Sequence, residues 1–108
     1  MNPIEQFEKL LANGQDNALL RYSLGNAYLK EGDLSAAIEH LGQAVKHDTG
    51  YTAAWKAYAG ALADSGNLEQ AIDAYEQGIA AANNNGDIQA GKEMRVFLKR
   101  LHKQWDQK

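Results

Sequence analysis

Apolar residues recur along this chain at spacings of three and four, the pattern of amphipathic helices. Over residues 3–13 the apolar positions are Ile4, Phe7, Leu10 and Leu11. Asn2 is placed to cap this helix, with Glu5 three residues later as its capping-box partner. Asn13 and Gly14 then give a stop signal. We therefore predict a first helix here.

The same pattern predicts five more helices, separated by short turns. We expect them over residues 17–30, 34–46, 52–64, 68–82 and 87–106. Gly32 and Gly66 end the second and fourth, Asp33 and Asn67 cap the helices that follow, and Gln70 is placed for a capping box. The cluster 83–86, Asn-Asn-Asn-Gly, ends the fifth. Alternating strand patterns are absent, so we predict an all-α fold of about six antiparallel helices.

The chain also repeats itself at an offset of 34 residues. Gly25–Ala44 has the sequence GNAYLKEGDLSAAIEHLGQA, and Ala59–Gly78 has AGALADSGNLEQAIDAYEQG, with six of twenty positions identical. Ile4 is in register with Ile38 and Ile72, so the first helix matches the second half of each repeat. We divide the single domain 1–108 into a half-repeat helix (3–13), two repeats (18–51 and 52–85) and a capping helix (87–106). The apolar face of each repeat is then buried against the other repeat, and the two faces together form the core.

The repeated residues resemble the tetratricopeptide repeat (TPR) family, whose 34-residue unit is a helix–turn–helix. The first copy has Leu24-Gly25, Tyr28, Gly32, Ala37, Leu41 and Ala44 at the family's positions. The second copy has Trp55, Tyr58-Ala59, Leu62, Gly66, Ala71, Tyr75 and Gly78. Two departures are Arg21, where an aromatic residue is usual, and Thr49 and Asn83, where a proline ends the unit. The resemblance implies an α-α superhelix (solenoid) that acts as a protein-binding module.

Composition and charge narrow the class of partner. The 108 residues are 44% hydrophobic and 23% charged, as expected of one globular domain. Residues 1–86 carry 5 Lys+Arg and 11 Asp+Glu, which gives a net charge of −6. Residues 87–108 carry 6 Lys+Arg and 3 Asp+Glu, which gives a net charge of +3. An acidic body argues against nucleic acid as the partner.

There is no cysteine, no secretory signal and no membrane-spanning run, so we expect a soluble cytoplasmic protein.

Residues with catalytic or metal-binding chemistry form no recognisable motif. His40 and His47 are seven residues apart and could share a helix face, but no third or fourth ligand accompanies them at a familiar spacing. We interpret them as surface or packing histidines. Nucleophile elbows, phosphate loops and dinucleotide fingerprints are also missing from the sequence. We therefore expect no enzyme activity, no cofactor and no metal.

The resemblance implies that the first helix of each repeat lines a concave groove that binds a peptide. The groove residues it implies are Tyr22, Asn26, Leu29, Lys30, Lys56, Asp64, Lys92, Arg95 and Lys99, with Ala53, Gly60 and Ala63 between them. The cations favour a peptide with an acidic segment or a C-terminal carboxylate. The carboxylate clamp of some family members is not expected, because only Asn26 fits it. The alternative, that these cations merely solvate the surface, stays open.

Trp105 offers a choice between two roles. It could staple the last helix to the core, the role that we favour because large aromatics supply much of a small core. Otherwise it marks a patch for self-association, and the alternative function is a structural protein that assembles through its C-terminal helix.

Overall fold

The structure is a computed structural model that describes residues 2–107 as six α-helices joined by short turns. Their bounds are α1 (Pro3–Ala12), α2 (Ala18–Lys30), α3 (Leu34–His47), α4 (Thr52–Asp64), α5 (Leu68–Asn85) and α6 (Ile88–Asp106). Residues 2–107 contain no strand. The predicted all-α architecture is confirmed.

Short polar side chains start four of the helices. Asn2, Asn17, Asp33 and Asp87 each accept a hydrogen bond from a backbone N–H three residues later, at 2.8–3.1 Å. The cap predicted for Asn67 is wrong. Its side-chain amide turns to the preceding residues and donates to Ser65 Oγ at 2.8 Å, and α5 begins without a side-chain cap. The capping box predicted with Gln70 is therefore absent too.

The length of α5 departs from the repeat. It has 18 residues where α3 has 14, because it continues through the three asparagines that were predicted to end it. It stops only at Gly86, whose left-handed backbone (φ 72°) turns the chain into α6. The extra turn of helix moves α6 out of the 34-residue register, and this shift decides which α6 residues face the groove described below.

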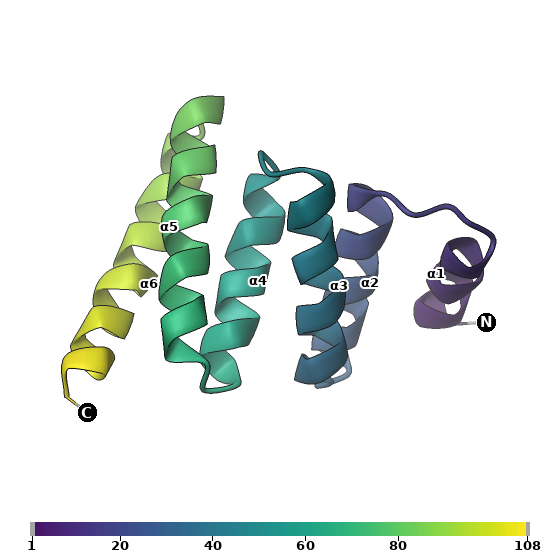
Figure 1. Cartoon of the computed structure of the whole chain (residues 1–108), viewed down its shortest axis with the longest axis horizontal. Helices are drawn as coiled ribbons and strands as arrows, with labels where there is room; N and C mark the ends of the chain where they lie inside the picture. The colour runs from purple at the N-terminus through teal and green to yellow at the C-terminus, as the bar shows by residue number, and fades with distance from the viewer. Residues whose placement is uncertain (1, 108) are drawn as a thin grey trace.

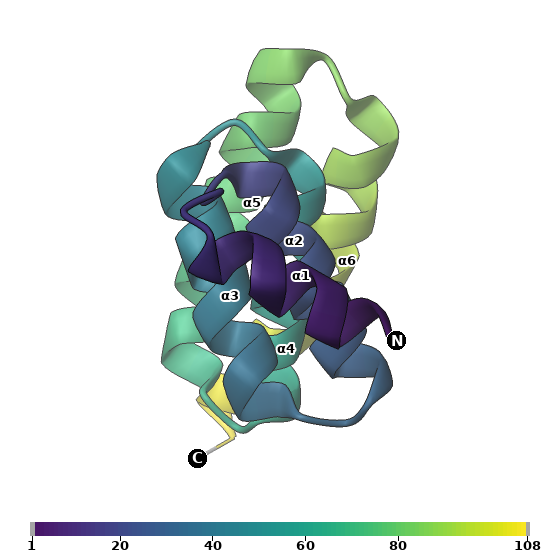
Figure 2. The same ribbon diagram turned by 90° about the vertical axis from the view of Figure 1, so that its right-hand side faces the viewer.

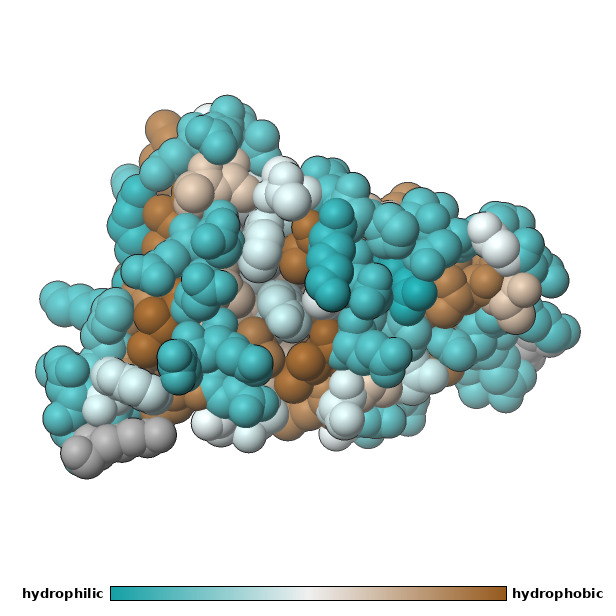
Figure 3. Space-filling model, in the orientation of Figure 1, coloured by the Kyte–Doolittle hydropathy of each residue, from teal (hydrophilic) through white to brown (hydrophobic). Residues whose placement is uncertain are grey.

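The helices follow one another in chain order along the longest axis of the molecule, with α1 and α6 at opposite ends (Figure 1). α2 packs on α3 and α4 packs on α5, while α3 contacts α4 and α5 contacts α6. Seen along the long axis, α3 and α5 lie on one side and α2 and α6 lie on the other (Figure 2). The surface over α3 and α5 is mostly hydrophilic, with small hydrophobic patches between the helices (Figure 3). No helix of residues 2–107 is both long and apolar enough to cross a membrane.

Close contacts between helices depend on small residues facing large ones. The largest fully buried side chains are Leu24, Leu41, Leu62 and Met94. Gly25 packs so closely on Leu41 that a Cβ atom at this glycine would overlap the leucine side chain. At Gly78, a Cβ atom would lie 2.6 Å from the Met94 sulfur. Glycine is therefore required by packing at positions 25 and 78, as in close helix pairs generally.

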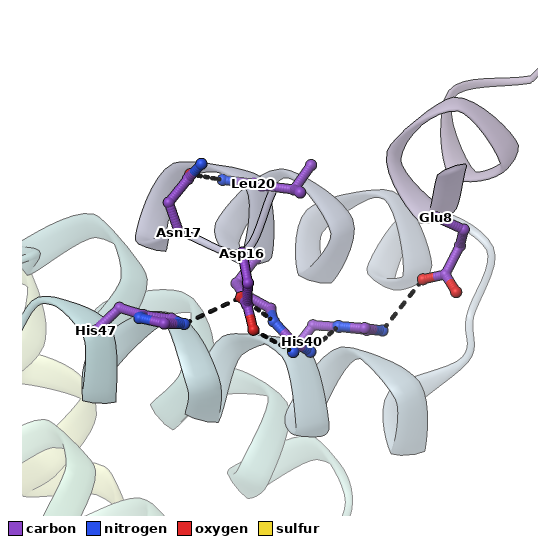
Figure 4. A network of polar contacts seen from close by, with 7 residues as sticks. Glu8, Asp16, Asn17, Leu20, His40 and His47 are labelled. Atoms are coloured by element: carbon purple, nitrogen blue, oxygen red, sulfur yellow. Dashed lines mark hydrogen bonds and ion pairs between the residues drawn. The ribbon is translucent and has the colours of Figure 1, made fainter. Parts of the chain in front are cut away.

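Position 21, where an aromatic residue is usual in the repeat, holds an arginine whose side chain takes part in a polar network (Figure 4). The Asp16 carboxylate accepts hydrogen bonds from Arg21 Nε at 2.8 Å and Nη2 at 2.9 Å, and from His47 Nε2 at 3.0 Å. The hydrogen bond from Arg21 is the largest influence on Asp16 and lowers its pKa from the usual 3.8 to about 2. The network joins the loop before α2 to α3.

His40 extends this network to the first helix. Arg21 Nη1 lies 3.1 Å from His40 Nδ1, and His40 Nε2 lies 3.5 Å from Glu8 Oε1 on α1. The His40 ring also stacks on Tyr28, with 5.5 Å between ring centroids. α1 itself has no fully buried residue. The contact of Glu8 with His40 therefore supplements a modest apolar contact between α1 and α2.

At the other end of the molecule, Trp105 does not staple α6 to the core as predicted. Leu101 is the last α6 residue in the core, and Trp105 is 39% exposed one turn later. The core beneath α6 is filled by Met94 and Leu101.

Candidate functional site: a groove across α2, α4 and α6

A groove of about 730 Å³ crosses the side of the molecule formed by α2, α4 and α6. Its lining residues are Tyr22, Leu29, Ala53, Lys56, Ala57, Gly60, Ala61, Ala63, Asp64, Tyr75, Phe97, Arg100, Leu101 and Gln104. Its volume is in the range of ligand sites in proteins. The groove is open to solvent along its length, as expected where stacked helix pairs curve.

α4 forms the floor of the groove with small side chains. Ala53, Ala57 and Ala61 recur every four residues and therefore lie on one face of the helix, with Gly60 beside them. A Cβ atom at Gly60 would lie 3.7 Å from the Tyr75 hydroxyl, an ordinary contact, so packing does not require glycine there. The floor lets the backbone of a bound segment come close to α4.

An aromatic pair forms one wall. The rings of Tyr75 and Phe97 stack with 5.9 Å between centroids, and the Arg100 guanidinium carbon lies 5.6 Å from the Phe97 centroid. Tyr75 is buried, and this burial raises the pKa of its phenol, with a smaller contribution from the nearby Asp64 carboxylate. Phe97 is 39% exposed. It therefore offers an apolar surface to a ligand while Tyr75 supports it from below.

The charges along the groove nearly balance. Lys56 Nζ lies 2.8 Å from Glu93 Oε1 on α6, so the lysine that was expected to be available to a ligand already has a partner. Arg100 has no carboxylate of residues 2–107 within ion-pair distance. Asp64 supplies the opposite charge. The groove is therefore mainly apolar, and the Arg100 guanidinium is its one cation without a carboxylate partner among residues 2–107. The sequence had instead predicted a cluster of cations there.

The structure brings together some of the predicted groove residues and separates others. Tyr22, Leu29, Lys56 and Asp64 line the groove, as do Ala53, Gly60 and Ala63. Asn26 and Lys30 instead line a smaller hollow of about 320 Å³ between α1 and α2, together with Phe7. That hollow exists because α1 packs beside this part of α2.

The three α6 cations, Lys92, Arg95 and Lys99, are not among the residues that line the groove. Phe97, Arg100 and Leu101 line it instead, 37 residues after Gly60, Ala63 and Asp64. The offset from α4 to α6 is therefore 37 residues and not the 34 of the repeat, because α5 is longer than α3. Lys92 and Lys99 are each one position before a residue on the groove side, Glu93 and Arg100.

Tyr75, Phe97 and Arg100 were not predicted as groove residues. Tyr75 belongs to the second helix of its repeat, which the family resemblance assigns to the other side. Phe97 lies three residues after Met94 and four before Leu101, both of which are buried in the core, so its spacing is that of a core residue.

No metal-binding cluster is present in the described part of the chain: residues 2–107 contain no group of three His, Asp or Glu side chains that could hold an ion. The nitrogens of His40 and His47 face Glu8, Arg21 and Asp16 within the network of Figure 4.

Comparison with known proteins identifies the repeat. Two family models, both described as tetratricopeptide repeat, match residues 28–94 and 4–51. A TPR repeat-containing protein of Pseudomonas aeruginosa is 51% identical over 98 residues, which cover 91% of this chain and 93% of that protein.

Two solved structures are similar to this fold. A Bordetella parapertussis protein, known from its solution structure, superposes with a TM-score of 0.80 at 40% identity and covers 96% of this chain and 90% of its own. A tetratricopeptide repeat domain protein of Salinibacter ruber has a TM-score of 0.73 at 23% identity, covering 80% and 87%.

Proposed function

The chain belongs to the tetratricopeptide repeat family, whose repeats generally mediate protein–protein interaction, and we propose that it binds a peptide segment of a partner protein in the groove across α2, α4 and α6. Proteins of this family are typically non-catalytic scaffolds, and we propose that this protein also acts without chemistry or a cofactor, in the cytoplasm. The observation that carries the proposal is the half-exposed Phe97 ring above a floor of small residues.

Apolar contacts supply most of the affinity in this proposal. A ligand side chain that packs between Leu29, Phe97 and Leu101 buries apolar surface of both partners, worth roughly 25 cal/mol per Å² before the cost of association. The small residues of α4 let the ligand backbone lie deep enough for this contact. Tyr22 and Asp64 also line the groove, and their polar groups orient the ligand.

An acidic group of the ligand pairs with Arg100. The guanidinium presents a fork of N–H donors that fits a carboxylate, whether a side chain or a C-terminus. Lys56 contributes less to recognition, because its charge is already compensated by Glu93. Asn26 and Lys30 contact the ligand only where it extends toward the smaller hollow beside α1.

A pair of adjacent charge reversals tests this proposal. Peptides of about 12 residues are selected from a random library against the wild-type protein, and their dissociation constants are then measured with Arg100→Glu and Lys99→Glu. Arg100 lines the groove and Lys99 does not, so the two variants change the same charge one residue apart. We expect Arg100→Glu to weaken binding about tenfold or more, and Lys99→Glu to change it less than about twofold. Equal effects would contradict the groove as the binding site.

Self-association through α6 is a second candidate function. It is favoured by the exposure of Ile88 (71%) and Trp105 (39%), two large apolar side chains at opposite ends of α6 that a second copy packed along the helix would cover. Sedimentation equilibrium at increasing protein concentration tests it. A dimer that Ile88→Ser and Trp105→Ser weaken would support it, and a monomer at the highest concentration would contradict it.

A further inference from the structure

One face of each repeat's first helix is covered by the second helix of the same repeat. On α2 this face includes Gly25, in contact with Leu41 of α3, and Tyr28, which stacks on His40. On α4 the equivalent residues, 34 positions later, include Ala59 and Leu62. Both are buried in one cluster with Ala71, Ala74 and Tyr75 of α5. In both repeats the face is therefore apolar and covered.

The corresponding face of α6 is charged and uncovered. With the offset of 37 residues established by the groove, Trp55, Tyr58, Ala59 and Leu62 of α4 correspond to Lys92, Arg95, Val96 and Lys99 of α6. Ala59 is fully buried, whereas Val96 is 52% exposed. α6 is thus built like the first helix of a repeat, and no helix of residues 2–107 follows it.

This face, which we call the α6 outer face, consists of Lys92, Arg95, Val96, Lys99 and Lys103, at spacings of three and four. None of its four cations forms an ion pair with a carboxylate of residues 2–107. Arg95 donates only to the amide oxygen of Asn83, at 3.2 Å. Glu93 is turned away to Lys56. Ile88, which is 71% exposed, lies on the same face four residues before Lys92. The outer face is therefore a mainly positive row with two exposed apolar side chains, Val96 near its middle and Ile88 at its start.

Solubility alone does not account for this arrangement. A terminal helix of a repeat protein needs a polar outer face, and a mixture of both signs meets that need. Here four cations face one carboxylate, Asp106 at the end of the helix, whereas residues 1–86 carry a net charge of −6. That acidic body repels a polyanion such as RNA but leaves room for one short acidic element at this end.

We propose that the α6 outer face binds an acidic amphipathic helix of a partner protein, which packs on α6 as α5 packs on α4. An apolar residue of the partner contacts Val96, and carboxylates three and four positions to either side face Lys92, Arg95 and Lys99. This site is separate from the groove, because none of its residues lines that groove. One chain then holds two partner segments, or two parts of one partner, at once.

The test uses two synthetic peptides and two double variants. The acidic peptide is an alanine-rich helix with a central leucine and glutamates three and four positions to either side, and its counterpart carries lysines instead. The variant Lys92→Glu/Lys99→Glu reverses the outer face. The control Lys9→Glu/Lys46→Glu makes the same change of charge at exposed positions on α1 and α3. Amide NMR locates binding, and circular dichroism checks that each variant keeps its helices.

We expect the acidic peptide to shift the amides of α6 around Val96 and to bind about tenfold more weakly to Lys92→Glu/Lys99→Glu, which should instead bind the lysine peptide. Three results would overturn the proposal. The first is an equal loss with Lys9→Glu/Lys46→Glu, and the second is shifts outside the outer face. The third is occupation of the outer face by something else, either a second copy in sedimentation or a short RNA that binds it more tightly than the peptide.

Discussion

The Lys56 ammonium on α4 pairs with the Glu93 carboxylate on α6 at 2.8 Å, across a wall of the groove. Both side chains are about 40% exposed, at 39% and 42%, so the pair stabilises the fold by at most about 1 kcal/mol. Its larger effect is on the charge of the groove. We predict that Glu93→Gln changes the free energy of unfolding by less than about 1 kcal/mol and makes the groove bind acidic peptides more tightly.

Denaturant unfolding and peptide titration check this prediction. The control is Glu76→Gln, an exposed carboxylate of α5 that does not line the groove. An equal gain in affinity with both variants would mean that the net charge of the protein, and not the release of Lys56, controls binding.

Two glycines should respond in opposite ways to the same added methyl group. Gly25→Ala places a Cβ atom inside the Leu41 side chain, and we expect a loss of about 1–3 kcal/mol in the free energy of unfolding. Gly60→Ala meets only the Tyr75 hydroxyl at an ordinary distance, and we expect a gain of about 0.5–1 kcal/mol, since alanine favours the helix. Urea unfolding of both variants measures the difference. A stable Gly25→Ala protein would refute the close packing of α2 on α3.

The carboxylate of Asp16 should make stability depend on pH in acid. Its pKa is about 2 in the folded protein, and 3.8 is its usual value. A lowered folded pKa stabilises the fold above the unfolded value, and this contribution disappears as the pH falls from about 4 toward 2. We therefore predict that the wild type loses more stability than Asp16→Asn over this range.

The measurement is the free energy of unfolding at a series of pH values for the wild type, Asp16→Asn and Asp73→Asn. Asp73 is an exposed carboxylate for which the described residues provide no ion pair. The Asp73→Asn protein should therefore follow the wild type. Parallel curves for all three proteins would show that the bond from Arg21 to Asp16 is not formed in solution.

The neutral His40 ring should adopt one tautomer. A guanidinium can only donate, so the contact of Arg21 Nη1 with His40 Nδ1 requires Nδ1 to accept and leaves the proton on Nε2, toward Glu8. Long-range ¹H–¹⁵N spectra of the neutral ring distinguish the two tautomers. A protonated Nδ1 would rule out this hydrogen bond, and Arg21→Lys should reduce the preference because its ammonium is not a fork of donors.

The repeat made the fold predictable from sequence. Apolar spacing gave each helix, and the recurrence of Gly25, Tyr28 and Leu41 as Ala59, Leu62 and Tyr75 indicated helix pairs that pack on one another. Such positions are constrained by burial, so they leave a strong pattern in the sequence. The same register gave Tyr22 and Leu29 of α2 and most of the α4 lining, but Asn26 and Lys30 line the hollow beside α1 instead.

The α6 end could not be predicted because one local detail changed its register. Three asparagines are common in turns, yet here they complete the last turn of α5 and move α6 by about one turn. At the resulting offset of 37 residues, Gly60 and Ala63 correspond to Phe97 and Arg100, which line the groove, whereas Lys92 and Lys99 each precede a groove-side residue by one position. The pairing of Lys56 with Glu93 also depends on this shift. Exposed charges carry little sequence signal, because many arrangements of them are equally stable.

The central claim is that the groove across α2, α4 and α6 binds the partner, and amide NMR of the labelled protein during titration with a selected peptide tests it most directly. We predict the largest shifts at Tyr22, Leu29, Gly60 and Phe97, with those of α3 and the outer side of α5 unchanged. Shifts confined to α3 and α5, with none at Gly60 or Phe97, would contradict the claim.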